Sequence, residues 1–363
     1  MAELLITGGA GFIGANFTRY WRQAYPSDGL TVLDALTYAA NPASLEGIPD
    51  VSFIHGDIRD YELIRRLLEE RAIDTLVHFA AETHVDRSIH GPDAFIGANI
   101  VGTHELLKAA KTVWLDGGTG KPHRFHHVST DEVFGSLGPF DPAFSETTAY
   151  RPNSPYSASK AASDHLVRAY HHTFGLQATA SNCSNNYGPY QFPEKLIPLF
   201  VINVLHGRPL PIYGDGLNVR SWLYVGDHCR GLELVVRRGR VGETYNIGGG
   251  MEFPNLTIID RICAEIDRAF TETPELARRF PDAPAARGEP SAVLKNFVAD
   301  RKGHDRRYAI DDDKIKSELG YAPRCDFGEG LQRTVQWYLS NEIWWRAVLD
   351  GSYARHVMVN QVI

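Results

Sequence analysis

The fold is decided near the N-terminus, where residues 4–14 read LLITGGAGFIG. A short apolar run leads into a GxxGxxG arrangement, and a helix-like segment, Ala15–Ala24, follows it. Gly8 permits a tight turn, Gly11 lets backbone N–H groups approach a pyrophosphate, and Gly14 lets helix and strand pack closely. Strand, glycine turn and helix in this order predict a dinucleotide site of the Rossmann type, with Phe12 and Ile13 at its helical side.

An acidic residue, Asp34, ends the next predicted strand, about 20 residues beyond the last glycine. A carboxylate there accepts hydrogen bonds from the adenosine ribose hydroxyls and repels a 2′-phosphate. Leu36 and Thr37 follow it, and no arginine lies beside it in the sequence. The cofactor predicted from this strand end is NAD rather than NADP.

Short apolar runs alternate with amphipathic segments through the first half of the chain. The predicted strands are Leu4–Thr7, Thr31–Asp34, Ser52–His55, Thr75–Phe79 and Phe125–Ser129, and the helix-like segments include Tyr61–Arg71 and Asn99–Trp114. This alternation predicts an α/β fold with a doubly wound parallel sheet covered by helices on both faces. Two strand ends could also face the cofactor: Asp57-Ile58 near the adenine and Ala80-Ala81 along the phosphates and ribose, although either pair could be ordinary strand-end residues.

Prolines break the pattern after Asn185. It returns in Leu223–Val236, which resembles a helix, and in Thr244–Ile247, which resembles a strand. We therefore predict a Rossmann-type NAD-binding domain over residues 1–187, to which 222–247 returns. A smaller, interleaved C-terminal domain for the substrate is predicted over 188–221 and 248–355. The charged, proline-rich stretch 271–290 is predicted to be a surface excursion.

The composition excludes several classes of partner. The chain has 363 residues and a net charge of −7, so nothing in its bulk charge favours nucleic acid or an anionic membrane. Its cysteines, Cys183, Cys229, Cys263 and Cys325, show no metal-binding spacing, and we interpret them as reduced packing residues. With no signal-peptide pattern and no apolar run long enough to span a bilayer, we expect a cytoplasmic protein without a metal.

Tyr156 and Lys160 form a YxxxK pair, which a helix would place on one face. A phenol is a weak acid, but a nearby ammonium and the positive charge of a nicotinamide are expected to lower its pKa. In isolation such a pair is common on protein surfaces. Downstream of the glycine turn, and with Ser129-Thr130 at a strand end, it is similar to the short-chain dehydrogenase/reductase superfamily, in which Ser or Thr, Tyr and Lys act together on a carbinol.

Two adjacent carboxylates, Asp131 and Glu132, follow Thr130 directly. Alcohol oxidation and 4-epimerisation need no such pair, whereas elimination of water needs one group to remove a carbon-bound proton and another to protonate the departing hydroxyl. The alternative is a solvated loop or a helix N-cap. The pair favours dehydration.

Five long segments carry a closer resemblance. They are AAETHVDRS (80–88), STDEVFG (129–135), NCSNNYGPY (182–190), FPEKLIP (192–198) and DRKGHD (300–305). Together they resemble the dTDP-glucose 4,6-dehydratase family, and the similarity runs from residue 3 to about residue 355. The departures are Phe134, Ala15, Ala40 and Lys302, where the family usually has Tyr, Ser, Gly and Pro, and none is a proposed proton-transfer group.

The resemblance implies an NAD-dependent conversion of dTDP-glucose to dTDP-4-keto-6-deoxyglucose and water. It implies that Tyr156 deprotonates the sugar 4-hydroxyl as hydride leaves C4, with Thr130 bonded to the same oxygen and Lys160 on the nicotinamide ribose. Glu132 would then take the C5 proton while Asp131 protonates the departing C6 hydroxyl, and the hydride would return to C6.

The resemblance also implies a set of substrate residues, with Asn186 on the cofactor side. They are Thr83, Asn185, Lys195, Leu196, Arg220 and Asn255, together with Arg301 and His304 in the loop 300–305. Lys195 and Arg220 suit a diphosphate, and Pro211 to Tyr213 can offer an apolar wall to a base. For His84 and His304 we favour hydrogen-bonding roles over metal binding.

Other functions are also compatible with these motifs. Within enzymes, the alternatives are a UDP-sugar 4-epimerase or a dehydratase of another nucleotide sugar. In a different class, the chain would be a silent NAD-sensing or scaffold protein on the same fold. The superfamily resemblance further implies a homodimer in which the helices expected over 99–114 and 157–173 pair as a four-helix bundle.

Overall fold

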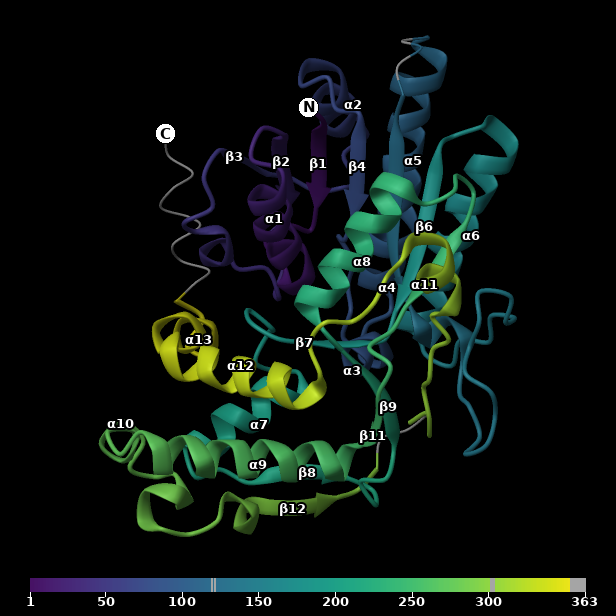
Figure 1. The fold of residues 1–363 in the computed structure, drawn as a ribbon. Coiled ribbons are helices and arrows are strands. Elements are labelled where there is room, and N and C mark those ends of the chain that lie inside the picture. The colour runs from purple at the N-terminus through teal and green to yellow at the C-terminus, as the bar shows by residue number, and fades with distance from the viewer. Residues whose placement is uncertain (119, 121, 301–303, 353–363) are drawn as a thin grey trace.

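A seven-stranded parallel sheet forms the centre of the larger part of the molecule (Figure 1). The structure, a computed structural model, describes residues 1–118, 120, 122–300 and 304–352. The strands run in the order β10-β6-β5-β4-β1-β2-β3. Their bounds are β1 Glu3–Thr7, β2 Gly29–Asp34, β3 Val51–His55, β4 Thr75–His78, β5 Arg124–Thr130, β6 Ala178–Cys183 and β10 Thr244–Ile247. The predicted α/β fold with a parallel sheet is confirmed.

Helices cover both faces of this sheet, because alternate residues of its strands point to opposite sides. Leu4 and Ile6 of β1 pack in one core cluster with Phe17 and Trp21, whereas Leu5 packs in another with the helices of the opposite face. Helices α1 (Phe12–Ala24) and α8 (Val225–Arg238) contribute to the first cluster, and α2 (Tyr61–Glu70), α5 (Thr103–Ala110) and α6 (Pro155–Phe174) contribute to the second. In Figure 1, α1 and α8 lie in front of the sheet.

The helix predicted over Asn99–Trp114 is part of a longer one. Helix α4 (Asp93–Phe95) continues through a π-helical stretch, η2 (Ile96–Gly102), into α5, and a second π-helical stretch, η3 (Lys111–Asp116), ends it. At Gly102 a Cβ would lie 2.5 Å from the Ile58 side chain, so this helix packs closely on the loop after β3.

A second, smaller part lies below the sheet in Figure 1. It contains the three-stranded sheet β11-β9-β7 and the two-stranded sheet β12-β8. Its strands are β7 Asn185–Tyr187, β8 Leu210–Tyr213, β9 Val219–Tyr224, β11 Glu252–Pro254 and β12 Lys295–Val298, and its helices are α7 Leu196–Leu205, α9 Asn255–Glu272, α10 Leu276–Arg279, α12 Phe327–Ser340 and α13 Glu342–Leu349. These elements share a core of their own, which includes Phe200, Ile262 and Trp345.

Two sequence predictions are wrong in this region. Leu223 and Tyr224 end strand β9 and do not begin a helix, because α8 begins at Val225. The stretch 271–290 is not only a surface excursion, since Leu276, Phe280 and Ala283 are buried in the core of the smaller part. In the sequence, charged residues and prolines surround these apolar side chains, so the burial of this stretch was not predicted.

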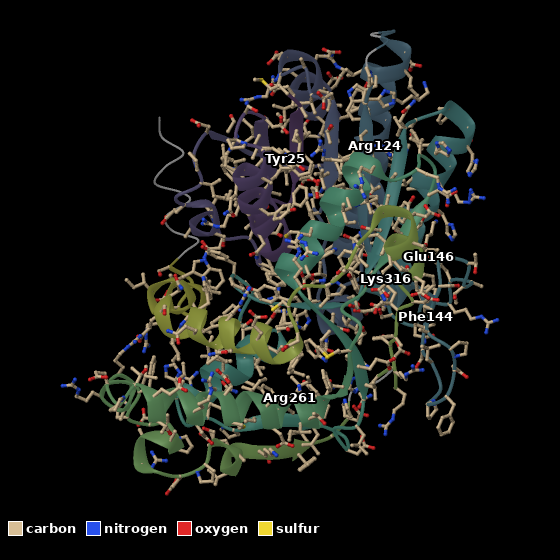
Figure 2. All side chains as sticks on the ribbon, in the orientation of Figure 1. Tyr25, Arg124, Phe144, Glu146, Arg261 and Lys316 are labelled. Carbon is tan, nitrogen blue, oxygen red and sulfur yellow. The ribbon has the colours of Figure 1, made fainter. Side chains whose placement is uncertain are left out.

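The loop between β5 and α6 is attached to the far edge of the large sheet. The backbone N–H of Asn246, in β10, donates to Glu146 Oε1 at 2.8 Å, and the Asn246 amide donates to the Phe144 carbonyl oxygen at 2.9 Å. Figure 2 labels Phe144 and Glu146 in this loop, and the Asn246 amide also donates to the Asp311 carbonyl oxygen at 3.0 Å, just before α11 (Asp313–Leu319). This attachment holds the chain between Asp131 and Tyr156 against the body of the protein.

Candidate active site

A cavity of about 500 Å³ lies at the carboxyl ends of the parallel strands. Its lining comes from the glycine turn after β1, the ends of β2 to β6, the start of α6 and the segment 191–195. Ligands of doubly wound sheets bind at this edge, where the strand order reverses between β1 and β4. The topology therefore brings the predicted cofactor and catalytic segments into one space.

The glycine turn has no room for side chains. Gly8 has a φ of +72°, and a Cβ on it would lie 2.6 Å from the backbone nitrogen of Ala80. At Gly14 a Cβ would lie 2.3 Å from the Gly8 carbonyl oxygen, so α1 begins in direct contact with the turn. Such a cradle lets a pyrophosphate approach backbone N–H groups at a helix N-terminus, and it fits a dinucleotide.

Asp34 is buried at the end of β2 and lines the cavity. Its two oxygens accept hydrogen bonds from the backbone N–H groups of Ala10 and Leu36, both at 2.9 Å. Burial raises the pKa of Asp34, while these two backbone hydrogen bonds lower it. Asp34 therefore anchors the glycine turn in addition to facing the place expected for the ribose.

Most of the other predicted cofactor residues meet in the same cavity. Those in its lining are Gly11, Phe12, Ile13, Thr37, Asp57, Ile58, Ala80, Ala81 and Asn186, whereas Leu36 lies outside the lining. Arg59 also lines the cavity and was not predicted. It forms an ion pair with Asp57 at 2.6 Å, and the hydrogen bonds from Arg59 lower the pKa of Asp57.

All five predicted catalytic residues line the cavity: Thr130, Asp131, Glu132, Tyr156 and Lys160. Thr130 is the last residue of β5, and Asp131 and Glu132 begin the short 3₁₀ helix η4 (Asp131–Phe134). Tyr156 and Lys160 belong to the first turns of α6, whose start is fixed by a capping box between Ser154 and Ser157 and by Pro155.

The two adjacent carboxylates differ in their surroundings. Asp131 is only 2% exposed, and burial, followed by the neighbouring Glu132, raises the pKa of Asp131 to about 8. Thr130 Oγ1 donates to Asp131 Oδ1 at 3.5 Å, and Asp131 Oδ2 makes no hydrogen bond with any residue that the structure describes. At neutral pH Asp131 therefore carries a proton that it can donate.

The surroundings of Tyr156 correct one expectation. Burial raises the pKa of Tyr156 well above its usual value, Glu132 raises it further, and a hydrogen bond with Thr130 lowers it. Lys160 is not among the main groups that act on the phenol in the protein alone. Its Nζ donates to the Val128 carbonyl oxygen at 2.8 Å, and burial lowers the pKa of Lys160.

The predicted substrate residues divide into two groups. Thr83, Asn185 and Lys195 line the cavity, and Lys195 Nζ donates to the Thr83 carbonyl oxygen at 3.4 Å. The remaining described ones lie outside the lining: Leu196 at the start of α7, Pro211 and Tyr213 in β8, Arg220 in β9, Asn255 at the start of α9, and His304. Arg301 lies outside the described residues.

Arg220 connects this second group to the catalytic carboxylates. It is buried, donates to the Asp305 carbonyl oxygen at 2.9 Å, and lies over the Tyr308 ring at 4.3 Å from its centroid. Burial lowers the pKa of Arg220, while Tyr308 and the nearby Glu132 and Asp131 raise it. A guanidinium of the smaller part therefore lies near the carboxylate pair.

The histidines considered for metal binding have carboxylate neighbours. His84 Nε2 lies 3.6 Å from Glu194, and His304 Nδ1 lies 2.6 Å from Asp300. Among residues 1–118, 120, 122–300 and 304–352, no group of three or more metal-ligating side chains is placed to hold an ion. Nor is any helix in those ranges long and apolar enough to cross a membrane.

The chain is similar to known proteins over nearly its whole length. The family model described as GDP-mannose 4,6 dehydratase matches residues 5–334. A dTDP-glucose 4,6-dehydratase of Xanthomonas campestris pv. campestris (strain B100) is 53% identical over 360 residues, 97% of each chain. One from Neisseria meningitidis serogroup B is 49% identical over 358 residues, covering 97% of this chain and 98% of its own.

The chain belongs to the dTDP-glucose 4,6-dehydratase family. A solved structure, the dTDP-glucose 4,6-dehydratase DesIV from Streptomyces venezuelae with NAD and dTDP bound, superposes with a TM-score of 0.84 at 47% identity. The alignment covers 95% of this chain and 99% of DesIV. In this member of the dTDP-glucose 4,6-dehydratase family, the glycine cradle and the carboxylate pair line one cavity.

Proposed function

We infer that this protein is an NAD-dependent hydro-lyase that converts dTDP-glucose to dTDP-4-keto-6-deoxyglucose and water. The observation that carries this inference is that the glycine cradle, Tyr156, Lys160 and the Asp131-Glu132 pair line a single cavity. The protonated state of Asp131 suits a residue that must supply a proton to a departing hydroxyl.

In the first step Tyr156 removes the proton of the sugar 4-hydroxyl, and Thr130 hydrogen-bonds the same oxygen. The glycine cradle and Asp34 would hold NAD, which when bound would supply the hydride acceptor and a positive charge. Lys160 adds a second positive charge. Both charges favour the phenolate, and they oppose the effect of burial on the pKa of Tyr156.

In the second step the new 4-ketone makes the C5 proton acidic, and Glu132 removes it. Asp131 protonates the C6 hydroxyl, which leaves as water. The hydride taken from C4 would return to C6, and a proton would return to C5, which completes the product. Each proton transfer can supply on the order of a hundredfold to ten-thousandfold in rate.

We propose the following division of labour between the two parts of the chain. Residues 1–187, with 222–247, hold NAD, and residues 188–221 and 248–355 hold the nucleotide sugar. Arg220 and Lys195 neutralise the diphosphate. Pro211 and Tyr213 border the base, and His304 belongs to the same site. Support comes from the position of Arg220, which faces the carboxylate pair from β9.

We also propose a homodimer, formed by α6 and the helix over residues 93–116 from each subunit. On this helix Ile96 is 49% exposed and Val101 is 44% exposed, and such side chains are usually covered. Light scattering at micromolar concentration should give twice the mass of the chain. Val101→Glu should reduce that mass, and an active monomer in the unmodified protein would contradict the proposal.

A cytoplasmic location is proposed because all four cysteines are unpaired, as is usual in a reducing compartment. Two other functions are less well supported. A 4-epimerase has no use for a buried, protonated Asp131, and a silent sensor has no use for a complete set of proton-transfer groups.

Mass spectrometry of the products from a panel of nucleotide hexoses tests the function directly. With dTDP-glucose, the product mass should be lower by one water. Loss of water from a UDP- or GDP-hexose in preference to dTDP-glucose would overturn the substrate assignment. An isomer of unchanged mass would indicate epimerisation.

A further inference from the structure

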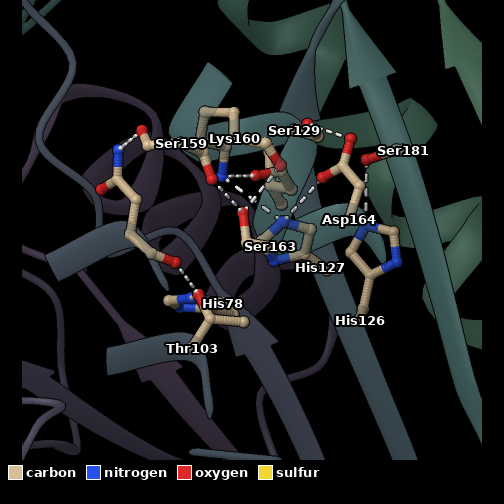
Figure 3. A network of polar contacts seen from close by, with 12 residues as sticks. His78, Thr103, His126, His127, Ser129, Ser159, Lys160, Ser163, Asp164 and Ser181 are labelled. Carbon is tan, nitrogen blue, oxygen red and sulfur yellow. Dashed lines mark hydrogen bonds and ion pairs between the residues drawn. The ribbon is translucent and has the colours of Figure 1, made fainter. Parts of the chain in front are cut away.

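A buried polar network adjoins Lys160 and has no part in the steps above (Figure 3). Its central member is Asp164, which is buried and lies outside the lining of the cavity. Asp164 follows Lys160 by four residues in α6, so both side chains lie on one face of that helix. This face packs against β5, which carries Thr130 at its end.

The two oxygens of Asp164 have different neighbours. Oδ2 accepts hydrogen bonds from Ser129 Oγ at 2.8 Å and from the Tyr150 hydroxyl at 3.0 Å. Oδ1 lies 3.0 Å from His127 Nε2, and the same nitrogen lies 3.5 Å from Lys160 Nζ. Figure 3 shows the His127 ring between the carboxylate and the ammonium.

A carboxylate and an ammonium are costly to bury unless each has a partner. Burial lowers the pKa of Lys160, and Asp164 is the group that raises it most. Burial raises the pKa of Asp164 to about 6, and Lys160 is the group that lowers it most. The two side chains therefore hold each other in the charged state.

Several other titratable groups surround this pair. They are His78 of β4, His126 and His127 of β5, Tyr150, His165 of α6 and Cys183 of β6. Burial lowers the pKa of His78, His126 and His127 well below the usual value and raises that of Cys183 to about 12, so these four groups are neutral near pH 7. Asp164 is thus the carboxylate that supplies negative charge to Lys160 from this side.

We propose that Asp164 is the buried counter-charge that keeps Lys160 protonated beside Tyr156, with the neutral His127 ring separating the two charges. Asp164 is then a positioning residue for the first oxidation. Its effect on the reaction rests on the proposed function, whereas its effect on the charge of Lys160 does not.

The proposal predicts how the rate of C4 oxidation depends on pH. Oxidation at C4 needs the Tyr156 phenolate and the Lys160 ammonium, so its rate rises with pH as Tyr156 loses its proton and falls as Lys160 loses its own. Without the Asp164 charge, Lys160 gives up its proton at a lower pH. A less charged Lys160 favours the phenolate less, so Tyr156 then loses its proton at a higher pH.

Asp164→Asn is the test, because the amide keeps the size of the side chain and removes its charge. In single turnovers with dTDP-glucose, followed by NADH absorbance, the alkaline limb of the pH profile should move to lower pH by about one unit or more, and the acid limb should move to higher pH by a smaller amount. Ser163→Ala is the matched control: Ser163 is buried beside Asp164, and its hydroxyl donates to the Lys160 carbonyl oxygen at 2.8 Å. The limbs of that variant should stay in place.

A purely structural role for Asp164 would lower the rate equally at all pH values, and unchanged limbs in Asp164→Asn would overturn the proposal. If that variant does not fold, Tyr150→Phe decides. It removes one donor to the carboxylate, so Asp164 should keep its proton to a higher pH and the acid limb should move upward. An acid limb that does not move in Tyr150→Phe would also overturn the proposal.

A measurement without substrate separates this proposal from the proposed function. Lysine labelled with carbon-13 at Cε reports its own protonation by NMR, and Lys160→Met identifies the Lys160 signal. The titration of Lys160 should lie at lower pH in Asp164→Asn than in the unmodified protein. Identical titrations would overturn the proposal, even if dTDP-glucose proved not to be the substrate.

Discussion

The carboxylate of Asp34 accepts a hydrogen bond from the backbone N–H of Ala10 at 2.9 Å, which joins the end of β2 to the glycine turn. The residue expected to select NAD is therefore also a support of the cradle that holds the pyrophosphate. A change at this position alters both the shape of the cradle and the charge beside the ribose.

Asp34→Asn should weaken NAD binding by about tenfold to a hundredfold, since it replaces charge-assisted hydrogen bonds with neutral ones and leaves one backbone donor facing an amide. Discrimination against NADP should fall at the same time. Titration calorimetry on protein stripped of cofactor would measure both affinities. Asp57→Asn is the control, because the Asp57 carboxylate lines the cavity but already pairs with Arg59. This variant should lose less NAD affinity than Asp34→Asn. Turnover with NADP equal to that with NAD in the unmodified protein would contradict our interpretation of Asp34.

Substitutions of the catalytic residues should stop the reaction at different points. Glu132→Gln and Asp131→Asn should still oxidise C4, so NADH absorbance should appear while release of the dehydrated product falls by about a hundredfold or more. Tyr156→Phe should fail before NADH appears. Rapid-quench mass spectrometry together with absorbance would separate the two stages. Undiminished dehydration by both carboxylate variants would show that Asp131 and Glu132 are loop residues without a catalytic role.

The hydride should remain within one active site through each turnover. With dTDP-glucose deuterated at C4, the product should carry deuterium at C6, which proton and deuterium NMR would locate. Unlabelled substrate added in the same reaction serves as the control, because its product should stay unlabelled. Deuterium retained at C4, or shared between the two products, would exclude an internal hydride cycle.

The elimination step should depend on pH through Asp131. Burial raises the pKa of Asp131 to about 8, so the acid is protonated below that pH and loses its proton as the pH rises through it. Once C4 is oxidised, the rate of water loss should be level below about pH 8 and fall about tenfold per unit above it. Single-turnover quench experiments from pH 6.5 to 10 would measure this limb, and a rate still rising beyond pH 9 would contradict the role of Asp131.

Stability should depend on pH through His228, a fully buried residue of α8. Burial lowers the pKa of His228 to about 3, and neither ring nitrogen makes a hydrogen bond with the described residues. The unfolded chain takes up a proton at this residue below pH 6.5 and the folded chain does not, so the contribution of neutral His228 is complete above pH 6.5 and is lost as pH falls toward 3. Between pH 6.5 and pH 5, the free energy of unfolding of His228→Leu should therefore rise by about 1.6 kcal/mol relative to that of the unmodified protein. Urea unfolding at the two pH values measures this gain, and an equal difference at both would disprove the explanation.

The sequence predicted those elements whose local pattern matches their burial. Strands β1, β2 and β3 are rich in branched apolar residues, and the glycine turn specifies its own conformation through Gly8 and Gly14. Strand β6 was missed because Ala178–Cys183 consists of small and polar residues, which are nevertheless buried between β5 and β10. Its hydrogen bonds to neighbouring strands, rather than its side chains, define it.

The site was predicted where function lies in contiguous motifs and was missed where it depends on packing. Thr130, Asp131 and Glu132 are adjacent in the sequence, and Tyr156 and Lys160 are one helical turn apart. By contrast, the role proposed for Asp164 depends on its contacts with His127 and Tyr150. These two residues come from other segments, so no local sequence pattern predicts the contacts. The raised pKa of Tyr156 results mainly from burial, which cannot be predicted from the YxxxK pattern.

Strand β9 passes directly into α8, since Tyr224 ends the strand and Val225 begins the helix. The chain crosses repeatedly between the two parts: the smaller one is assembled from segments such as 185–224, 252–298 and 327–349, and the intervening segments contribute α8, β10 and α11 to the larger one. A chimera that borrows its base specificity from a relative therefore cannot be made with a single crossover. It needs several matched splices, one of them at the junction of Tyr224 and Val225, where there is no loop to absorb a mismatch.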